Sequence, residues 1–290
     1  MIGIGKGECF GAGTIVSAVA TGLGASFGLG LKVCARVTLT EDRKFVLKNE
    51  DLKGENLLAE ISCKRTLEFF GKDYGAIIET ESNIPISKGL KSSSASSIAV
   101  IRATANALGV EMKKEDVLNI SCDCAIQSGV SITGAFDDAS ACLLGGVCVT
   151  DNKKRKVLAS YQIEPELDVV IYLPPRTIKK EIVKRYKDKI RKLEPIVNYA
   201  HKLALKGDYF TAMNLNGLIY SNAFNEFRSA EIAMEMLNAG ALSAGMSGTG
   251  PSVVSLVAKD NTKKVIDAVN SNIKEGEKII CTRVRNLESW

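Results

Sequence analysis

The segment of the chain that is best suited to chemistry lies between residues 84 and 97. It reads Ile-Pro-Ile-Ser-Lys-Gly-Leu-Lys-Ser-Ser-Ser-Ala-Ser-Ser, so five serines follow a Pro-x-x-x-Gly-Leu turn. Glycine and serine let the backbone curve around an anion, and the N-terminus of a following helix attracts negative charge. A turn that only caps a helix is the alternative, but capping uses one serine. The pattern predicts a phosphate-binding loop, to which Lys88 and Lys91 add positive charge.

A second candidate is a pair of neighbouring carboxylates, Asp137 and Asp138, in a segment that runs from Gly134 to Gly146. Sequence neighbours on one helix cannot face the same way. One aspartate is therefore expected to do chemistry while the other caps the helix or supports its partner. The alternative is that both only compensate the dipole of a short helix.

A third candidate is Ser247-Gly248-Thr249-Gly250-Pro251 near the C-terminus, which predicts a tight turn facing a ligand or a simple strand connection. Commoner nucleotide motifs are missing from the sequence. The Gly-x-x-x-x-Gly-Lys-[Ser/Thr] loop does not occur, and neither Gly22-Leu23-Gly24 nor Gly248-Thr249-Gly250 has the third glycine of a dinucleotide fingerprint.

The elements that must position these segments alternate between helical and strand patterns. The expected strands are 14–20, 31–39, 44–47, 74–80, 147–150, 157–161, 169–173 and 278–284, with two more, one on either side of the glycine-rich loop after residue 238. The expected helices are 56–70, one from the serine-rich segment to 107, 114–128, a short one within 133–146, several between 174 and 238, and 263–272. Glycine-rich residues 22–30 are expected to lie between strands. Pro174-Pro175 predicts a boundary between domains 1–173 and 174–290. The mixture favours an α+β fold.

The composition limits which classes of protein the chain can belong to. The 290 residues carry 46% hydrophobic and 24% charged side chains, which is typical of a soluble globular protein with room for two lobes. The net charge of +5 and the 6% aromatic content argue against nucleic-acid binding, and the basic run 179–192 is best explained by a solvated helix face. A small anionic substrate fits this charge.

Cysteine and histidine usage narrows the chemistry further. The eight cysteines form no Cys-x-x-Cys pair and His201 is the single histidine, so zinc sites, disulfide frameworks and a Ser-His-Asp triad are disfavoured. His201 is expected to be structural. Glycines interrupt the uncharged stretch 9–31, which therefore does not resemble a membrane span or a signal peptide. These features predict a cytoplasmic protein with reduced thiols.

The three candidate segments occur in the order found in the GHMP kinase superfamily, which the chain resembles over nearly its whole length. The serine loop resembles the Pro-x-x-x-Gly-Leu-Gly-Ser-Ser-Ala motif, and residues 246–252 resemble the C-terminal glycine-rich motif. The segments 12–30, 133–139 and 216–220 are most similar to those of archaeal-type shikimate kinases. The chain departs from the family pattern at Lys91, where a glycine or serine is usual, at Ser94, where alanine is common, and in the N-terminal motif.

The resemblance implies a two-lobed GHMP-kinase-like α+β fold with an N-terminal α+β lobe, a C-terminal ferredoxin-like lobe and an active site between them. It implies ATP and Mg²⁺ as cofactors, with the Mg²⁺ on the hydroxyl of Ser93. It also implies Asp137 as the catalytic residue that accepts or orients the substrate proton, with Asp138 in a secondary role. The implied nucleotide-binding residues are Pro85, Ile86, Ser87, Lys88, Gly89, Leu90, Lys91, Ser92, Ser93, Ser94, Ala95, Ser96, Gly248, Thr249 and Gly250.

The implied activity is transfer of the ATP γ-phosphate to a hydroxyl of shikimate, in aromatic amino-acid biosynthesis. The alternatives are a homoserine or mevalonate-pathway kinase with the same machinery, and a catalytically silent metabolite-binding member of the family. Shikimate and ATP are the implied small-molecule partners, with no nucleic acid and no membrane. The sequence leaves the oligomeric state and the residues that bind the substrate carboxylate open.

Overall fold

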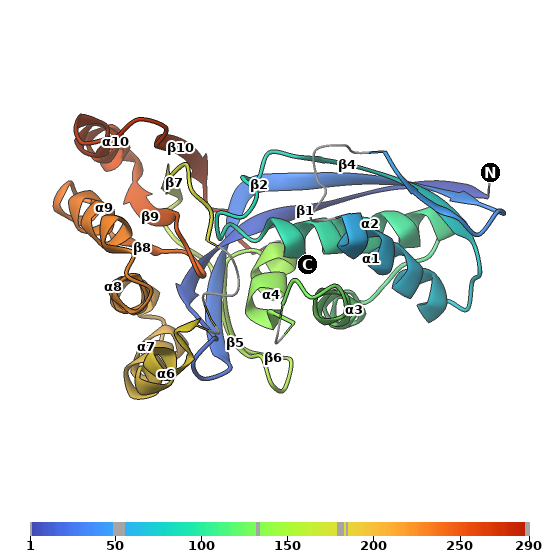
Figure 1. Ribbon diagram of the computed structural model, residues 1–290, viewed down its shortest axis with the longest axis horizontal. Helices are drawn as coiled ribbons and strands as arrows, with labels where there is room; N and C mark the ends of the chain where they lie inside the picture. The colour runs from blue at the N-terminus through green and yellow to red at the C-terminus, as the bar shows by residue number, and fades with distance from the viewer. Residues whose placement is uncertain (1, 49–55, 132–133, 179–182, 184, 288–290) are drawn as a thin grey trace.

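The structure is a computed structural model that describes residues 2–48, 56–131, 134–178, 183 and 185–287. It has two lobes that lie side by side (Figure 1). The N-terminal lobe contains a sheet of six strands in the order β3-β4-β2-β5-β6, with β1 paired to β2. Its elements are β1 (Gly3–Val16), β2 (Leu23–Thr40), β3 (Phe45–Leu47), α1 (Asn56–Phe69), β4 (Gly75–Ser82), α2 (Ser92–Leu108), α3 (Lys114–Gln127), α4 (Phe136–Leu144), β5 (Val147–Asp151) and β6 (Lys156–Tyr161).

Strand β2 organises this lobe because it is long enough to pair with three partners. Its first residues pair with β5, its later residues pair with β4, and β1 runs along it in antiparallel register. The predicted strand 31–39 lies within β2, but the predicted bounds of both strands were wrong. Strand β1 begins at Gly3 and ends at Val16, and β2 also includes the glycine-rich residues 23–30. Glycine lowers strand propensity, so the local pattern concealed the first part of each strand.

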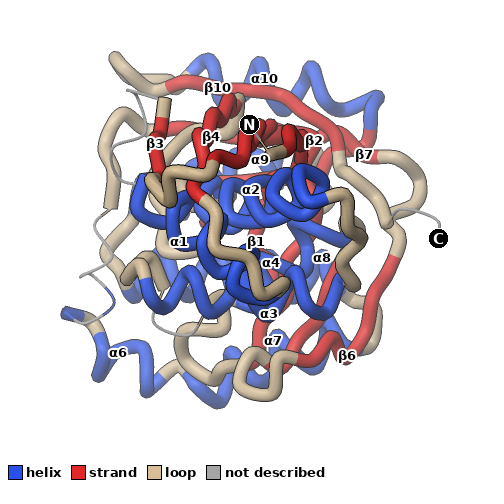
Figure 2. Tube along the Cα trace, turned by 90° about the vertical axis from the view of Figure 1, so that its right-hand side faces the viewer, coloured by secondary structure: helices blue, strands red, loops and turns tan. Residues whose placement is uncertain are grey.

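The glycines of β1 are explained by the helix that covers them. Gly3, Gly5 and Gly7 alternate along the strand and share one face, against which α2 lies. A Cβ on Gly5 would lie 2.1 Å from the carbonyl oxygen of Ala103, and a Cβ on Gly7 would lie 2.3 Å from that of Ala99. The glycines thus allow α2 to approach the sheet backbone. Figure 2, with the N-terminus toward the viewer, shows α1, α2 and α3 grouped beside the sheet.

The C-terminal lobe contains four strands in the order β10-β7-β9-β8, all in antiparallel pairs. Helices connect β7 to β8, and α10 connects β9 to β10, which is the ferredoxin-like arrangement that the resemblance implied. Its elements are β7 (Leu167–Leu173), α6 (Lys187–Lys192), α7 (Glu194–Leu205), α8 (Tyr209–Ala223), α9 (Phe227–Asn238), β8 (Ser243–Met246), β9 (Val253–Ala258), α10 (Thr262–Ser271) and β10 (Lys278–Arg283). By strand pairing, β7 belongs to this lobe although it precedes the predicted boundary at residue 174.

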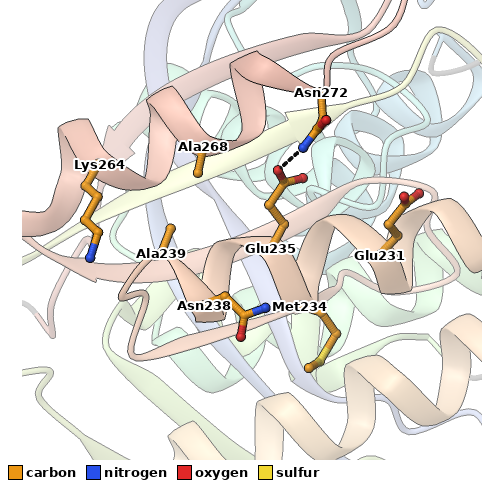
Figure 3. A pocket seen from close by; sticks show the side chains of 8 residues that line it. All are labelled: Glu231, Met234, Glu235, Asn238, Ala239, Lys264, Ala268 and Asn272. Carbon is orange, nitrogen blue, oxygen red and sulfur yellow. Dashed lines mark hydrogen bonds between the residues drawn. The ribbon is translucent and has the colours of Figure 1, made fainter.

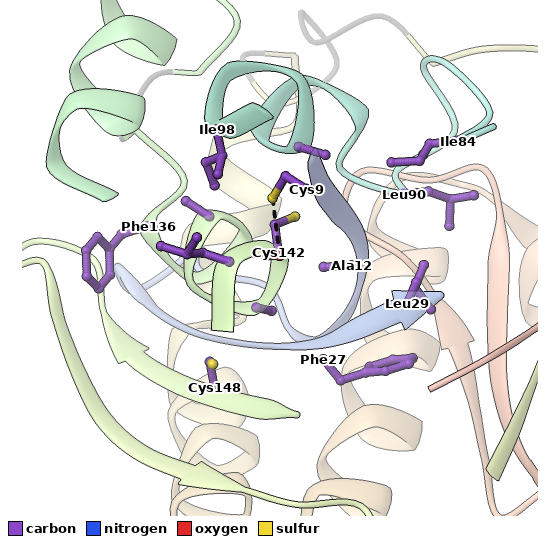
Figure 4. Close-up of a cluster of buried hydrophobic side chains, with 14 of the residues drawn as sticks. Cys9, Ala12, Phe27, Leu29, Ile84, Leu90, Ile98, Phe136, Cys142 and Cys148 are labelled. Atoms are coloured by element: carbon purple, nitrogen blue, oxygen red, sulfur yellow. Dashed lines mark hydrogen bonds between the residues drawn. The ribbon is translucent and has the colours of Figure 1, made fainter. Parts of the chain in front are cut away.

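The principal core lies between the N-terminal sheet and its helices, and it continues into the C-terminal lobe. Figure 4 shows part of it, where Cys9 lies beside Cys142 and its thiol donates a hydrogen bond to the Cys142 carbonyl. Phe27 and Leu29 of β2 belong to another part of the same cluster. All eight cysteines are free, and most are buried. Within the described residues, no helix has the length and apolar character needed to cross a membrane.

Candidate active site

The serine loop connects β4 to α2 and leaves the N-terminus of α2 without negative charge. Ser87, Gly89 and Lys91 have φ values of 56°, 77° and 65°, so alternate residues of the loop adopt left-handed conformations. Such alternation turns successive backbone N–H groups toward one side and forms a concavity that suits an anion. Lys91 precedes α2 without capping it through its side chain, and the first turn of α2 contains no acidic residue. The geometry and charge of the loop are therefore compatible with an external anion.

The serines of this loop fall into two groups. Ser92, Ser96 and Ser97 are buried, and the hydroxyl of Ser97 lies 2.8 Å from that of Ser62 in α1. Ser93 and Ser94 are half-buried on the first turn of α2. Leu90 and Ala95 are also buried, and together with the buried serines they anchor the loop to the core. The sequence predicted all of these residues to bind the nucleotide and did not separate the buried ones from the half-buried ones.

The two lysines of the loop have different partners. The ammonium of Lys88 donates hydrogen bonds to the carbonyls of Pro174, Pro175 and Arg176, at 2.6, 3.1 and 2.6 Å. These contacts use its three N–H donors and tie the serine loop to the segment after β7. Burial, with the nearby Arg176 guanidinium, lowers the pKa of Lys88.

Lys91 instead points across the site to the second candidate segment. Its Nζ lies 3.1 Å from Oδ1 of Asp138, and its side chain is 9% exposed. A Cβ on Gly248 would lie 2.9 Å from the same Nζ, so the absence of a side chain at Gly248 leaves room for the ammonium. Lys91, which belongs to the serine loop, thus contacts Asp138 and lies beside Gly248.

Ser247 joins the glycine-rich turn to the serine loop and to β1. Its hydroxyl accepts a hydrogen bond from the backbone N–H of Thr14 at 3.1 Å and donates one to the carbonyl of Gly89 at 2.8 Å. The N–H of Gly248 in turn donates to Oγ1 of Thr14 at 2.9 Å. The backbones are so close that a Cβ on Gly89 would lie 2.2 Å from the carbonyl oxygen of Ser247. The turn connects β8 to β9, and these contacts place it against the serine loop.

The two aspartates open α4 and have different environments. Asp138 accepts hydrogen bonds at Oδ1 from Lys91 and, at 3.2 Å, from the hydroxyl of Ser26, and its side chain is 18% exposed. Asp137 is 5% exposed, and its Oδ1 accepts a hydrogen bond from Nδ2 of Asn152 at 2.7 Å. Its Oδ2 faces Gly24, where a Cβ would lie 2.5 Å away. Burial, with the neighbouring Asp138 carboxylate, raises the pKa of Asp137.

Several residues of this arrangement were not found from the sequence. Asn152 lies in the turn between β5 and β6, in a run of turn-forming and charged residues that carries no distinguishing signal. Ser26 and Thr14 are single hydroxyl residues within strands. Thr133, part of the predicted aspartate segment, lies outside the described residues. His201 is buried in α7 with its Nε2 3.2 Å from the carbonyl of Thr150, as expected for a structural histidine.

Asn216, in the segment 216–220 that the resemblance singled out, holds the chain just after β1. Its Oδ1 accepts a hydrogen bond from the N–H of Ser17 at 2.9 Å, and the hydroxyl of Tyr220 lies 3.5 Å from the carbonyl oxygen of the same residue. Two residues of α8 in the C-terminal lobe therefore hold Ser17, just after the end of β1.

A surface depression of about 520 Å³ lies elsewhere, between α9 and α10 (Figure 3). None of the aspartate, serine-loop or Gly248 residues lines it; its lining residues are Glu231, Met234, Glu235, Asn238, Ala239, Lys264, Ala268 and Asn272. Among the residues that the structure describes, no group of three His, Cys, Asp or Glu side chains is arranged to hold a metal ion.

Solved structures of two small-molecule kinases have a similar fold. Homoserine kinase from Cytophaga hutchinsonii superposes with a TM-score of 0.76 at 20% identity, covering 98% of this chain and 96% of that one. Mevalonate kinase from Methanococcus jannaschii also gives a TM-score of 0.76, at 18% identity, with 97% and 98% coverage. At these identities the similarity establishes the fold alone.

Sequence comparison gives closer relatives. The shikimate kinase of Methanococcoides burtonii is 38% identical over 284 residues, covering 97% of this chain and 96% of that protein. The shikimate kinase of Pyrococcus abyssi is 36% identical over 274 residues, with 92% and 96% coverage. The models of the GHMP kinases N terminal domain and the GHMP kinases C terminal region match residues 57–146 and 200–275. The chain belongs to the GHMP kinase family.

Proposed function

We propose that this protein is an ATP-dependent kinase that transfers the γ-phosphate of ATP to a hydroxyl group of shikimate, in aromatic amino-acid biosynthesis. The near full-length similarity to proteins named shikimate kinase supports the substrate. The observation that carries the reaction type is the Lys91–Asp138 pair, because it faces a helix N-terminus that has no acidic residue of its own. Phosphoryl transfer needs this combination of phosphate binding, charge neutralisation and a proton acceptor.

The nucleotide phosphates bind the serine loop in this proposal. Backbone N–H groups between Gly89 and Ala95 supply the donors, and the dipole of α2 adds favourable charge. The half-buried hydroxyl of Ser93 fits a Mg²⁺ ion, which takes oxygen ligands and is usually held by substrate phosphates with one or two protein groups. When bound, Mg²⁺ neutralises charge on the transferred phosphoryl group.

Asp138 is the proton acceptor in this proposal, which reverses the roles expected from the sequence. Its carboxylate is the more exposed of the two and lies beside the serine loop through Lys91. Asp137 is buried, and its raised pKa favours the protonated form that suits a supporting residue better than a base. Asp138 would take the proton of the acceptor hydroxyl as the oxygen attacks phosphorus.

Lys91 has two roles in this arrangement. Its ammonium holds the Asp138 carboxylate in position, and it lies where the serine loop meets Gly248. A fixed cation there opposes the negative charge of the phosphoryl group during transfer. This explains why a lysine stands where relatives of the wider family have glycine or serine.

Release of ADP tests the proposal when the protein is supplied with ATP, Mg²⁺ and one acceptor at a time from shikimate, homoserine, mevalonate and galactose. Shikimate-dependent ADP release, with the phosphorylated product identified by mass spectrometry, is the expected result. Turnover with homoserine or mevalonate and none with shikimate would leave a kinase with a different substrate. Binding without ADP release for every acceptor would favour a catalytically silent member of the family.

A further inference from the structure

The helix that carries both aspartates begins without a cap from its own chain segment. Ala135 precedes α4 with a φ of 51° and has no side chain that could accept a hydrogen bond. The first N–H groups of a helix lack partners within the helix and must find them elsewhere. Oδ1 of Asn152 accepts a hydrogen bond from the N–H of Asp137 at 3.1 Å. A residue from the β5–β6 turn therefore caps α4 from outside.

The remaining bonds of Asn152 determine the orientation of its amide. Oδ1 also accepts a hydrogen bond from Oγ1 of Thr150 at 2.8 Å, so it faces two donors. A flipped amide would place its NH₂ group against the N–H of Asp137, donor against donor. Nδ2 must therefore face the Asp137 carboxyl, to which it donates at 2.7 Å. Asn152 is 4% exposed, so water cannot readily replace these bonds.

We infer that Asn152 is a positioning residue of the active site, which holds both the backbone and the carboxyl group of Asp137 and thereby sets the direction of Asp138. The inference rests on the proposed function, because it assigns Asp138 the chemistry. The two aspartates share the first turn of α4, so a shift of that turn moves both carboxylates. Gly24 limits movement on the other side, since it lies against Oδ2 of Asp137.

The charged groups around Asp137 show what the amide of Asn152 contributes. Asp138 on α4 raises the pKa of Asp137 and Lys91 from the serine loop lowers it, while Cys122 on α3 has its own pKa raised by burial to about 12 and is uncharged. Nδ2 of Asn152 stabilises the ionised carboxylate, so its loss should raise the pKa of Asp137 further. A residue that only completed a turn would leave this titration unchanged.

The test compares Asn152→Ala and Asn152→Asp with wild type, using ¹³C-labelled aspartate carboxyl signals followed by NMR against pH. The Asp137 signal is assigned by its disappearance in Asp137→Asn. We expect the midpoint of Asp137 to rise by about one unit or more in both variants. With shikimate as acceptor, kcat should fall by about ten- to a hundredfold, because small displacements at a reacting centre are costly.

Asn286→Ala provides the matched control. The amide of Asn286 makes an equivalent pair of bonds, accepting from the N–H of Ile163 at 2.8 Å and donating to its carbonyl at 3.0 Å, but it does not touch the aspartates. This variant should leave the Asp137 midpoint and kcat unchanged. If Asn152→Ala altered neither quantity more than Asn286→Ala does, the positioning role would be overturned. Since the NMR titration needs no substrate, a wild type that ignores shikimate would refute the proposed function while the titration still tests Asn152.

Discussion

The N-termini of α2 and α4 have the same local geometry and opposite charge arrangements. Each follows a residue with positive φ, Lys91 at 65° and Ala135 at 51°, and neither of these residues caps its helix through its side chain. The first turn of α2 contains no acidic residue, whereas α4 begins with Asp137 and Asp138. Both termini favour negative charge. The N-terminus of α2 has no negative charge from its own helix, whereas the N-terminus of α4 has two carboxylates from its own first turn.

The difference shows how one local motif can serve two halves of a reaction. In the proposed reaction, the N-terminus of α2 binds the phosphates, and the N-terminus of α4 holds the carboxylate that receives a proton. Lys91 connects them, because it precedes α2 in the chain and its ammonium reaches Asp138 on α4. The predictions below disturb one terminus, the other, or the link between them.

Loss of the Lys91 ammonium, which connects the two helix N-termini, should reduce kcat more than the other changes below. In Lys91→Met the chain length is nearly kept but the charge is lost, so Asp138 loses its partner and the phosphoryl group loses a fixed cation. We expect kcat to fall by about 10²–10³-fold, as for loss of one preorganised charge-stabilising group. Steady-state kinetics with shikimate and ATP measure this.

Lys88→Met is the comparison for that variant, because it removes an ammonium from the same loop that contacts carbonyls after β7. It should lower stability, with a much smaller loss of kcat than Lys91→Met. Equal losses in the two variants would show that the loop needs only positive charge and not the contact with Asp138.

Gly248→Val crowds the same link from the C-terminal lobe. The new Cβ would lie within 2.9 Å of the Lys91 ammonium, at a residue whose φ of 62° already disfavours a side chain. Displacing the ammonium by about 1 Å should reduce kcat by about 10²-fold. Circular dichroism and thermal unfolding check that the fold is retained, and unchanged kinetics would show that this turn does not approach the reacting groups.

Ser94→Asp makes the N-terminus of α2 resemble that of α4. The half-buried side chain lies on the first turn, where an internal carboxylate would compete with the phosphates for the same N–H groups. The KM for ATP should rise by about tenfold, while the helix gains about 0.3–1 kcal/mol from the added charge. Ser94→Asn is the neutral control. An unaltered KM for ATP in the aspartate variant would argue against phosphate binding at this terminus.

Asp137→Asn tests the filled terminus through stability. The folded-state pKa of Asp137 is raised above its unfolded value, so the folded protein retains a proton that the unfolded chain releases. Wild-type stability should therefore fall as pH rises from about 4, the ordinary pKa of an aspartate, through the raised folded pKa. The asparagine side chain does not titrate, so the variant lacks this loss of stability. The free energy of unfolding of the variant minus that of wild type should therefore be more positive at pH 7.5 than at pH 5, by about 1 kcal/mol or more. Urea unfolding at both pH values measures the difference, and an equal difference at the two would mean that Asp137 titrates normally.

The parts of the site that the sequence predicted are those determined by local pattern. The serine loop and the helix after it were predicted together, because Gly89 and the serines carry a short-range signal that needs no distant partner. The short helix after Gly134 was expected for the same reason. The resemblance to the GHMP kinase superfamily then implied an active site between the two lobes.

The remaining features depend on contacts between distant segments. Gly3, Gly5 and Gly7 disfavour a strand locally, and only the approach of α2 explains them. The proposed division of roles between Asp137 and Asp138 rests on their contacts with Gly24, Asn152 and Lys91, none of which is near the pair in sequence. Strand β7 was expected in the first lobe, and its pairing with β9 and β10 appears only in the folded sheet.

The most direct test of the account compares phosphorylation of shikimate by Asp138→Asn and Asp137→Asn under identical conditions. Asp138→Asn should lose about 10²–10⁴-fold in kcat with ATP binding retained, as expected for removal of a general base. Asp137→Asn keeps an oxygen that can accept from Asn152, so its kcat should stay within about tenfold of wild type. Wild-type turnover by Asp138→Asn, together with loss of turnover in Asp137→Asn, would contradict the assignment.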